Sequence, residues 1–367
     1  MGNYKITIPH AGDYYITFSY FFRNIGYEVI VPPKTTQNTL SIGTRLAPEQ
    51  ACLPFKITLG NLVEGVDAGA NIIMMIGGRT GICRLAYYSE VHKKILQNHG
   101  YEFEVLLFRL KKELWDILKG HFPQLTVKKF LYTIYVFWNK IITLEHIHQL
   151  YLDTRPYEKR RGSSFALKQK LYHALDHADT VRAISRVKGF ANQKYAKIPK
   201  EKNDEVIRIG LVGEFYLLVD DFSTNYIEDI LGELGAEVKL TLTFSDFFVG
   251  SIKQIRFLDR FLPTHSHKIN KLAKPYVNRA IGGHARQSIG ETIYLSKQKC
   301  DAIIHIYPFS CMPEIVAGSL LSQISHDINT PVLSLSFDEH TGKAGLRTRI
   351  EAFLDMVKRR KANDKNN

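Results

Sequence analysis

A single cysteine follows an apolar run in the second half of the chain. Cys311 comes after "AIIHIYPF", which begins at Ala302 and is typical of a buried strand, and Pro313 and Glu314 suit the first turn of a helix. A helix start exposes backbone N–H groups and the positive end of the helix dipole, and both stabilise a thiolate. Cys311 could therefore bind a metal or act as a nucleophile. The alternative is a small buried hydrophobic residue.

Two other cysteines have similar surroundings. Cys52 precedes Pro54 in "APEQACLPFKITLGNLVEG", and Cys83 follows the apolar run "ANIIMMIGG". Cys83 and Cys311 occupy matching places, since each follows a buried strand and a short loop and precedes a helix. Open α/β sheets bind their ligands at this carboxyl end of the strands. Cys300 lies at the amino end of a strand instead, so we interpret it as structural.

Three thiolates gathered from two α/β parts would suit an iron–sulfur cluster. Sulfur is a soft ligand that iron in such clusters prefers, and helix dipoles offset the cluster's negative charge. The spacing alone leaves open that the three cysteines are unrelated core residues. The cysteines are too widely separated for a zinc ribbon or a secreted disulfide framework.

The elements around these cysteines alternate between strands and helices. Apolar runs bounded by Gly and Pro alternate with amphipathic helices, which predicts an α/β fold with two Rossmann-like parallel-sheet domains. A helical, basic middle region separates them. The expected domains are 1–110 with Cys52 and Cys83, a basic helical insertion at 111–202, 203–358 with Cys311, and a flexible tail at 359–367.

The net charge of +13 is concentrated in the middle region, where 19 Lys and Arg stand against 8 Asp and Glu. Such a region could dock an acidic partner or CoA phosphates, or be merely solvated. It also leaves a second interpretation open, a basic helical nucleic-acid-binding module on non-catalytic α/β domains. No apolar run approaches the roughly 18 residues of a membrane span, and the N-terminus does not have a signal-peptide layout. We therefore expect a cytoplasmic protein that contacts no membrane.

Several longer stretches resemble one known family. They include "ACLPFKITLGN", "GGRTGICRLAYYSEVHKKIL", "VNRAIGGHARQSIGETI" and "DAIIHIYPFSCMPEIVAGSLL". These are similar to the CoA protein activases, or acyl-CoA dehydratase activase-related proteins, of the 2-hydroxyacyl-CoA dehydratase and double-cubane-cluster superfamily. The resemblance covers about residues 3–110 and 205–358.

The resemblance implies a 4Fe-4S cluster, or a double-cubane cluster, held between two Rossmann-like domains by Cys52, Cys83 and Cys311. It also implies a partner ATPase of actin/Hsp70-like fold that delivers electrons at very low potential. Family members dehydrate a 2-hydroxyacyl-CoA through a ketyl radical or reduce small molecules. An acyl-CoA substrate and a homo- or heterodimer are thus expectations, whereas a catalytic or an accessory electron-carrier role stays open. Many relatives carry another cysteine where this chain has Arg79 or Thr80, which puts a fourth protein ligand in doubt.

Further residues are candidates for binding the cofactor. Arg84 and Lys56 could screen the charge of a cluster, with surface cations as the alternative. Gly282, Gly283 and His284, in "IGGHARQSIGE", precede a helix and could hold a CoA phosphate or pantetheine through backbone N–H groups, with a plain turn as the alternative. The sequence contains no G-x-x-x-x-G-K-[ST] phosphate loop, so we expect ATP hydrolysis to belong to a separate protein.

Overall fold

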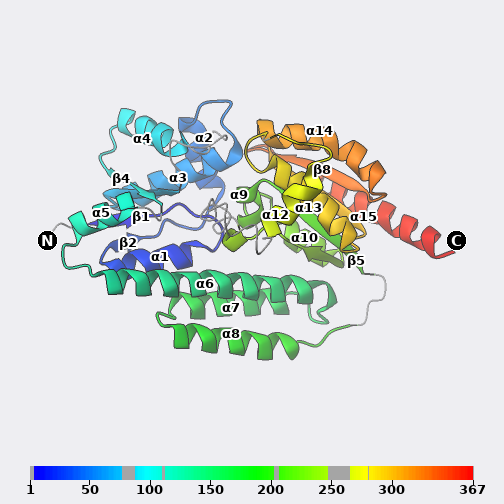
Figure 1. The fold of residues 1–367 in the computed structure, drawn as a ribbon, viewed down its shortest axis with the longest axis horizontal. Coiled ribbons are helices and arrows are strands. Elements are labelled where there is room, and N and C mark those ends of the chain that lie inside the picture. Colours follow the sequence, from blue (N-terminus) through cyan, green and yellow to red (C-terminus); the bar gives the residue numbers. More distant parts are fainter. Residues whose placement is uncertain are drawn as a thin grey trace. The chain divides into compact units, whose positions relative to one another are not determined.

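The computed structural model describes residues 4–76, 87–109, 112–201, 206–246, 265–279 and 281–366. The chain divides into two compact units (Figure 1). The first comprises Met1–Leu144 and Leu171–Gly189, and the second comprises Glu145–Lys170 and Phe190–Asn367.

The first unit is built on a four-stranded parallel sheet in the order β2-β1-β3-β4. Its strands are β1 (Lys5–Thr7), β2 (Glu28–Ile30), β3 (Ile72–Ile76) and β4 (Glu104–Phe108). Its helices are α1 (Tyr15–Ile25), α2 (Gln37–Leu46), α3 (Leu53–Asp67), α4 (Tyr88–Asn98) and α5 (Lys112–His121). The strand order reverses between β1 and β3, which is where open α/β sheets bind ligands.

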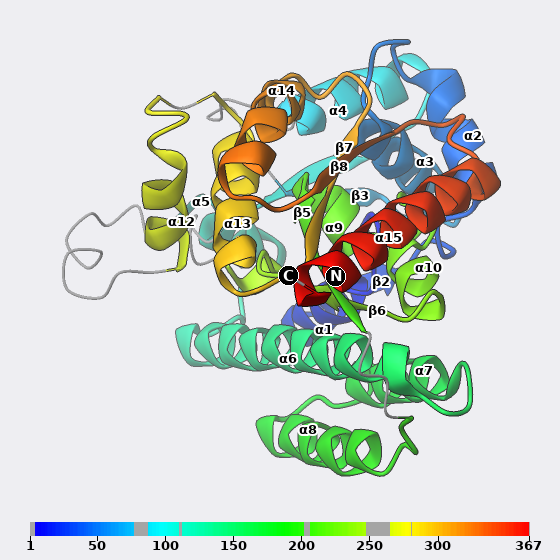
Figure 2. The same cartoon turned by 90° about the vertical axis from the view of Figure 1, so that its right-hand side faces the viewer.

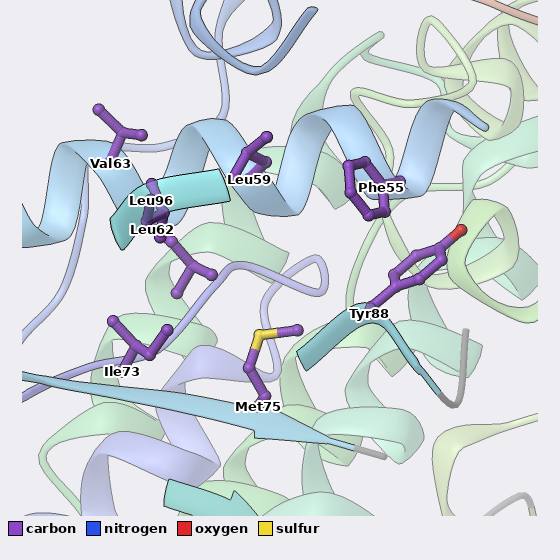
Figure 3. Packing of buried hydrophobic residues seen from close by; sticks show 8 residues of the cluster. All are labelled: Phe55, Leu59, Leu62, Val63, Ile73, Met75, Tyr88 and Leu96. Carbon is purple, nitrogen blue, oxygen red and sulfur yellow. The ribbon is translucent and has the colours of Figure 1, made fainter. Parts of the chain in front are cut away.

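Apolar packing on both faces explains this sheet. Ile72, Ile73, Met74 and Met75 of β3 are all buried, as expected of a parallel strand covered on both sides. Figure 3 shows the cluster between β3, α3 and α4. Its buried members are Phe55, Leu59, Leu62, Val63, Ile73, Met75, Tyr88 and Leu96. This cluster fixes the start of α3, and hence Cys52, against α4.

The second unit repeats the arrangement with the strand order β6-β5-β7-β8, again all parallel. Its strands are β5 (Ile207–Gly213), β6 (Ala236–Lys239), β7 (Ala302–Pro308) and β8 (Val332–Phe337). Its helices are α9 (Phe215–Val219), α10 (Ile227–Glu233), α12 (His265–Ala273), α13 (Ala285–Lys297), α14 (Met312–Asp327) and α15 (Lys343–Asn366). In Figure 2, α13 and α14 cover one face of this sheet, and α10 and α15 cover the other. The two parallel sheets confirm the predicted fold class.

Each unit contains a pair of helices between its second and third strands, in close backbone contact at a glycine. A Cβ atom on Gly43 of α2 would lie 1.7 Å from the carbonyl oxygen of Lys56 on α3, and one on Gly290 of α13 would lie 2.3 Å from that of Ile269 on α12. Real Cβ atoms do not come so close to other atoms, so both pairs need glycine at the contact.

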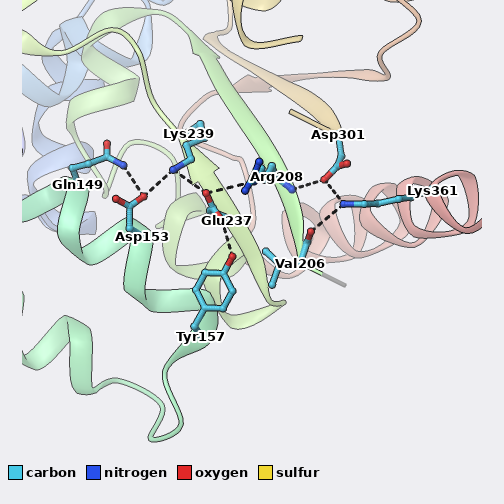
Figure 4. A network of polar contacts seen from close by, with 9 residues as sticks. All are labelled: Gln149, Asp153, Tyr157, Val206, Arg208, Glu237, Lys239, Asp301 and Lys361. Carbon is cyan, nitrogen blue, oxygen red and sulfur yellow. Dashed lines mark hydrogen bonds and ion pairs between the residues drawn. The ribbon is translucent and has the colours of Figure 1, made fainter. Parts of the chain in front are cut away.

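The basic middle region is helical. It contains α6 (Val127–Thr154), the 3-10 turn η2 (Arg155–Tyr157), α7 (Ser163–Asp176) and α8 (Val181–Ala196), and the division between the two units falls within all three α-helices. Within the second unit, polar contacts tie this region to the sheet (Figure 4). Lys239 of β6 pairs with Asp153 at 2.9 Å and with Glu237 at 2.8 Å, and the hydroxyl of Tyr157 donates to Glu237.

None of the helices in the described ranges is long and apolar enough to cross a membrane. The predicted domain boundaries at 110 and 202 remain predictions.

Candidate functional site

Cys52 is the N-cap residue of α3. Its backbone is extended, and its carbonyl oxygen accepts hydrogen bonds from the N–H groups of Phe55 and Lys56. Pro54 stands in the first turn, where its missing N–H costs nothing. The half-buried thiol thus lies at a helix N-terminus, as the sequence predicted. There the backbone dipoles favour negative charge on sulfur.

Aromatic side chains surround Cys52. Its sulfur shares a hydrogen bond with the hydroxyl of Tyr88, the first residue of α4. The ring of Tyr88 packs edge-on against Phe55, with centroids 4.8 Å apart (Figure 3). Phe55 in turn stacks on His92, 4.3 Å away. The thiol therefore has a hydroxyl partner held in place by an aromatic cluster.

His92 is fully buried beneath this cluster. Its Nε2 donates to the carbonyl oxygen of Phe55 at 3.1 Å, while its Nδ1 has no hydrogen-bond partner among the residues that the structure describes. Burial lowers the pKa of His92 to about 4, only partly opposed by the hydrogen bond to Phe55. The imidazole is therefore neutral at physiological pH.

Cys311 occupies the corresponding kind of position in the second unit. It follows β7 by a short loop in which Ser310 has a φ of 64°, and it is the N-cap residue of α14, with Pro313 in the first turn. The thiol is half-buried, whereas the neighbouring Phe309 and Met312 are each 64% exposed. Two exposed apolar side chains thus flank Cys311 in the sequence.

The other two cysteines, Cys83 and Cys300, are not placed at a helix start by the described part of the structure. Cys83 lies outside the described residues, as does Arg84, so the predicted set of three thiols stays a prediction. Among the residues that are described, no three or more His, Cys, Asp or Glu side chains gather to hold a metal ion. Cys300 is 6% exposed in an apolar cluster with Val212, Leu295 and Ile303, and burial raises the pKa of its thiol to about 11. This environment agrees with a structural role.

Lys56 is only 3% exposed in the first turn of α3. The alternative that it is a surface cation is therefore wrong. Its carbonyl oxygen lies against Gly43 of α2, at the close contact between the two helices. Its side chain remains a candidate for balancing charge near Cys52.

The glycine-rich loop before α13 lies against the start of α14. Gly282 and Gly283 have φ values of 103° and 49°, and a Cβ on Gly283 would be 3.1 Å from the side chain of Pro313. His284 is the N-cap residue of α13, and burial lowers the pKa of its imidazole. Two stretches that the sequence analysis singled out separately, at 282–284 and at Cys311, are therefore neighbours within the second unit.

The sequence analysis gave no functional role to three buried ionisable residues beside this loop. They are Glu214 after β5, His305 in β7 and Glu314 in α14. His305 Nε2 donates to Glu314 Oε2 at 2.9 Å. A signal was present for His305, because it interrupts an otherwise apolar run, but nothing in the sequence pairs it with Glu314 or places Glu214 nearby.

A histidine connects α12 to α13 in the second unit. His265 and His267 both belong to α12. His265 Nε2 lies 2.8 Å from Glu291 on α13, and this carboxylate raises the pKa of the imidazole. The pair therefore links the two helices.

Comparison with known proteins adds one match. Residues 5–75 match the family model described as a CoA enzyme activase uncharacterised domain. No curated protein matches the chain. The matched segment runs from β1 through β3 and includes Cys52 with its helix. This part of the chain is therefore similar to a domain of CoA enzyme activases.

Proposed function

We propose that this chain binds an iron–sulfur cluster of the 4Fe-4S type through Cys52, Cys83 and Cys311. In this proposal it serves low-potential electron transfer, or reductive or radical dehydration of a 2-hydroxyacyl-CoA. The observation that carries the proposal is that Cys52 and Cys311 are both half-buried N-cap residues of proline-started helices. The similarity of residues 5–75 to a CoA enzyme activase domain supports the same context.

The donors that are described fit such a cluster. Thiolates are its usual ligands, and a helix N-terminus offers N–H groups and a positive dipole to a negatively charged group. When bound, the cluster supplies one-electron transfer, and three protein ligands would leave one iron open. The half-burial of both thiols limits solvent access while leaving the sulfurs reachable.

Tyr88 would tune this cluster through Cys52. Its hydroxyl shares a hydrogen bond with the Cys52 sulfur, and Tyr88 itself is only 7% exposed. A hydrogen bond donated to a ligating thiolate stabilises the more negative, reduced cluster and so raises its reduction potential. Tyr88 is therefore a positioning and tuning residue in this proposal.

A separate ATPase of actin/Hsp70-like fold would deliver the electrons. Lys159, Arg160 and Arg161 are all exposed between η2 and α7, and they form a candidate docking surface for an acidic partner. Reversing these three charges should weaken partner binding most at low salt, because salt screens exposed charges. Equal binding by the reversed variant at low salt would remove this surface from the proposal.

Anaerobic purification separates the cluster from the nucleic-acid alternative. The protein should be brown and should give an electron paramagnetic resonance signal after reduction, and its binding of duplex DNA or of RNA should be negligible at physiological salt. A colourless protein that binds nucleic acid with a steep salt dependence would contradict the proposal and favour the basic helical module.

A further inference from the structure

A buried polar cluster lies at the carboxyl ends of β5 and β7 in the second unit. Glu314 is fully buried and accepts a hydrogen bond from His305 Nε2, and Ser334 Oγ of β8 lies 3.2 Å from His305 Nδ1. The other carboxylate oxygen, Glu314 Oε1, is buried with no hydrogen-bond partner among the described residues. An acceptor buried in this way is costly unless a donor reaches it, so the oxygen points to a bound proton, water or ligand group.

A second acid is brought to the same place by the backbone. Glu214 directly follows β5, and its N–H donates to the carbonyl oxygen of Ile306, the residue after His305. This approach needs the preceding glycine, because Gly213 has a φ of 141° and a Cβ on it would lie 1.8 Å from that same oxygen. Glu214 is buried as well, with 8% of its surface exposed.

The position matches the place where such sheets bind ligands. The strand order of the second sheet, β6-β5-β7-β8, reverses between β5 and β7. A crevice outside the carboxyl ends of the strands at this point is the general ligand site of open α/β folds.

The pKa of Glu214 makes it the group near Glu314 that can exchange a proton at neutral pH. Burial raises the pKa of Glu214 to about 7, and the negative charge of Glu314 adds to this rise. Backbone N–H groups of Tyr216 and Leu217 oppose it, because they stabilise the carboxylate. Glu214 is therefore half-protonated near neutral pH.

The other ionisable groups facing this pair remain neutral or paired. Burial, with the charges of Asp220 and Glu214, holds the pKa of Tyr216 well above its usual range. Burial lowers the pKa of His284, against the pull of Glu314. His305 is hydrogen-bonded to Glu314.

We propose that Glu214 and Glu314 together form a proton-donor site at the carboxyl ends of β5 and β7, which hands one proton to an oxygen atom of a bound compound. In this step the O–H bond of the Glu214 carboxylic acid breaks, the proton bonds to a hydroxyl or carbonyl oxygen of the compound, and Glu214 becomes a carboxylate. Solvent then returns the proton. Two buried acidic side chains disfavour the binding of a phosphate group here, because like charges repel one another. The compound should therefore present an uncharged oxygen. The proposal does not depend on an iron–sulfur cluster.

The alternative to a proton donor is that Glu214 has a purely structural role. Its Oε2 accepts the N–H of Leu217 at 3.2 Å and so caps the short helix α9. A cap works best as a carboxylate and needs no proton exchange near neutral pH. The two roles therefore differ in the protonation state of Glu214 and in how fast its proton exchanges.

Infrared spectroscopy of the full-length protein tests the proposal. The wild type should show the C=O band of a buried carboxylic acid that disappears as the pH rises through about 7. The band should be lost in Glu214→Gln, and in Glu314→Gln it should disappear at lower pH because the neighbouring negative charge is gone. Glu291→Gln, at a buried carboxyl that is 3% exposed elsewhere in the unit, should leave the band unchanged.

Exchange into D₂O separates a proton donor from a sealed structural acid. The band should shift under native conditions, faster than the protein unfolds. A band that survives Glu214→Gln, no carboxylic-acid band at pH 6, or exchange only on unfolding would each overturn the proposal. If Glu214→Gln does not fold, the shift in Glu314→Gln still decides the question, because a Glu214 that is always ionised would show no band to move.

Discussion

The two sheets share one strand order, and each carries a pair of helices between its second and third strands. The N-cap residue of the second helix in the pair is Cys52 in the first unit and His284 in the second. The first unit surrounds its thiol with an aromatic cluster that contains a neutral histidine, His92. The second unit places a pair of buried acids at the same end of its sheet. The backbone is repeated, whereas the chemistry at the carboxyl ends of the strands has diverged.

This difference suggests a division of tasks. In the proposal, the aromatic side chains near Cys52 tune a redox group, and the acids at the carboxyl ends of β5 and β7 donate a proton.

The shared helix pair gives the largest expected effect. Gly43→Ala in the first unit and Gly290→Ala in the second should each destabilise the protein by about 3 kcal/mol or more, because a Cβ would overlap a backbone carbonyl. Chemical denaturation measures this loss. Gly189→Ala in α8 is the matched control, since nothing lies within 4 Å of its Cβ position and alanine favours a helix by about 1 kcal/mol. Equal stability of all three variants would show that the close contacts are not real.

The two units should respond to pH in opposite directions. His92 takes up a proton near pH 6.5 when unfolded but only near pH 4 when folded, so its contribution to stability is present above pH 6.5 and is lost on acidification. Glu214 loses its proton near pH 4.5 when unfolded and near pH 7 when folded. Its contribution is present below pH 4.5 and is lost as the pH rises to 7. Each effect has an upper limit of roughly 3 kcal/mol.

Hydrogen exchange followed by mass spectrometry can measure the opposite pH dependences of local stability in the two units of one protein. Between pH 7.5 and pH 5, protection around α3 and α4 should fall and protection around α9 should rise, after correction for intrinsic rates. His92→Gln should remove the first trend and Glu214→Gln the second, while His173→Gln, at an exposed histidine, should change neither. Trends of the same sign in both units would refute the contrast.

A smaller effect, on the reduction potential of a bound cluster, should distinguish the adjacent residues Tyr87 and Tyr88. Tyr88→Phe removes the hydroxyl that contacts Cys52, so the reduction potential of a bound cluster should fall by on the order of 40 mV, the equivalent of one hydrogen bond. Tyr87→Phe, at a residue that is 48% exposed, should leave the potential unchanged. Protein-film voltammetry or a redox titration gives both values. A potential that is the same in Tyr88→Phe and the wild type would show that this hydroxyl does not act on the cluster.

Local patterns in the sequence were enough to predict much of the fold. Apolar runs gave the strands of both sheets, and Pro54 and Pro313 marked the helix starts behind Cys52 and Cys311. The contacts that define the sites could not be predicted. Tyr88 is 36 residues from Cys52, and Glu314 is 100 residues from Glu214.

Such pairs depend on how strands of a parallel sheet are ordered, and no local pattern encodes that order. The burial of Lys56 likewise could not be predicted from a local pattern. His305 is the exception, since a polar residue inside an apolar run signals a buried partner.

Iron and acid-labile sulfide in anaerobically prepared protein, measured for the wild type and for serine variants at each cysteine, test the central claim most directly. The wild type should contain both elements in equal amounts. Cys52→Ser, Cys83→Ser and Cys311→Ser should each lose most of them, whereas Cys300→Ser, in the apolar core of the second unit, should retain them. Equal retention in all four variants, or a wild type without iron after reconstitution, would contradict the account.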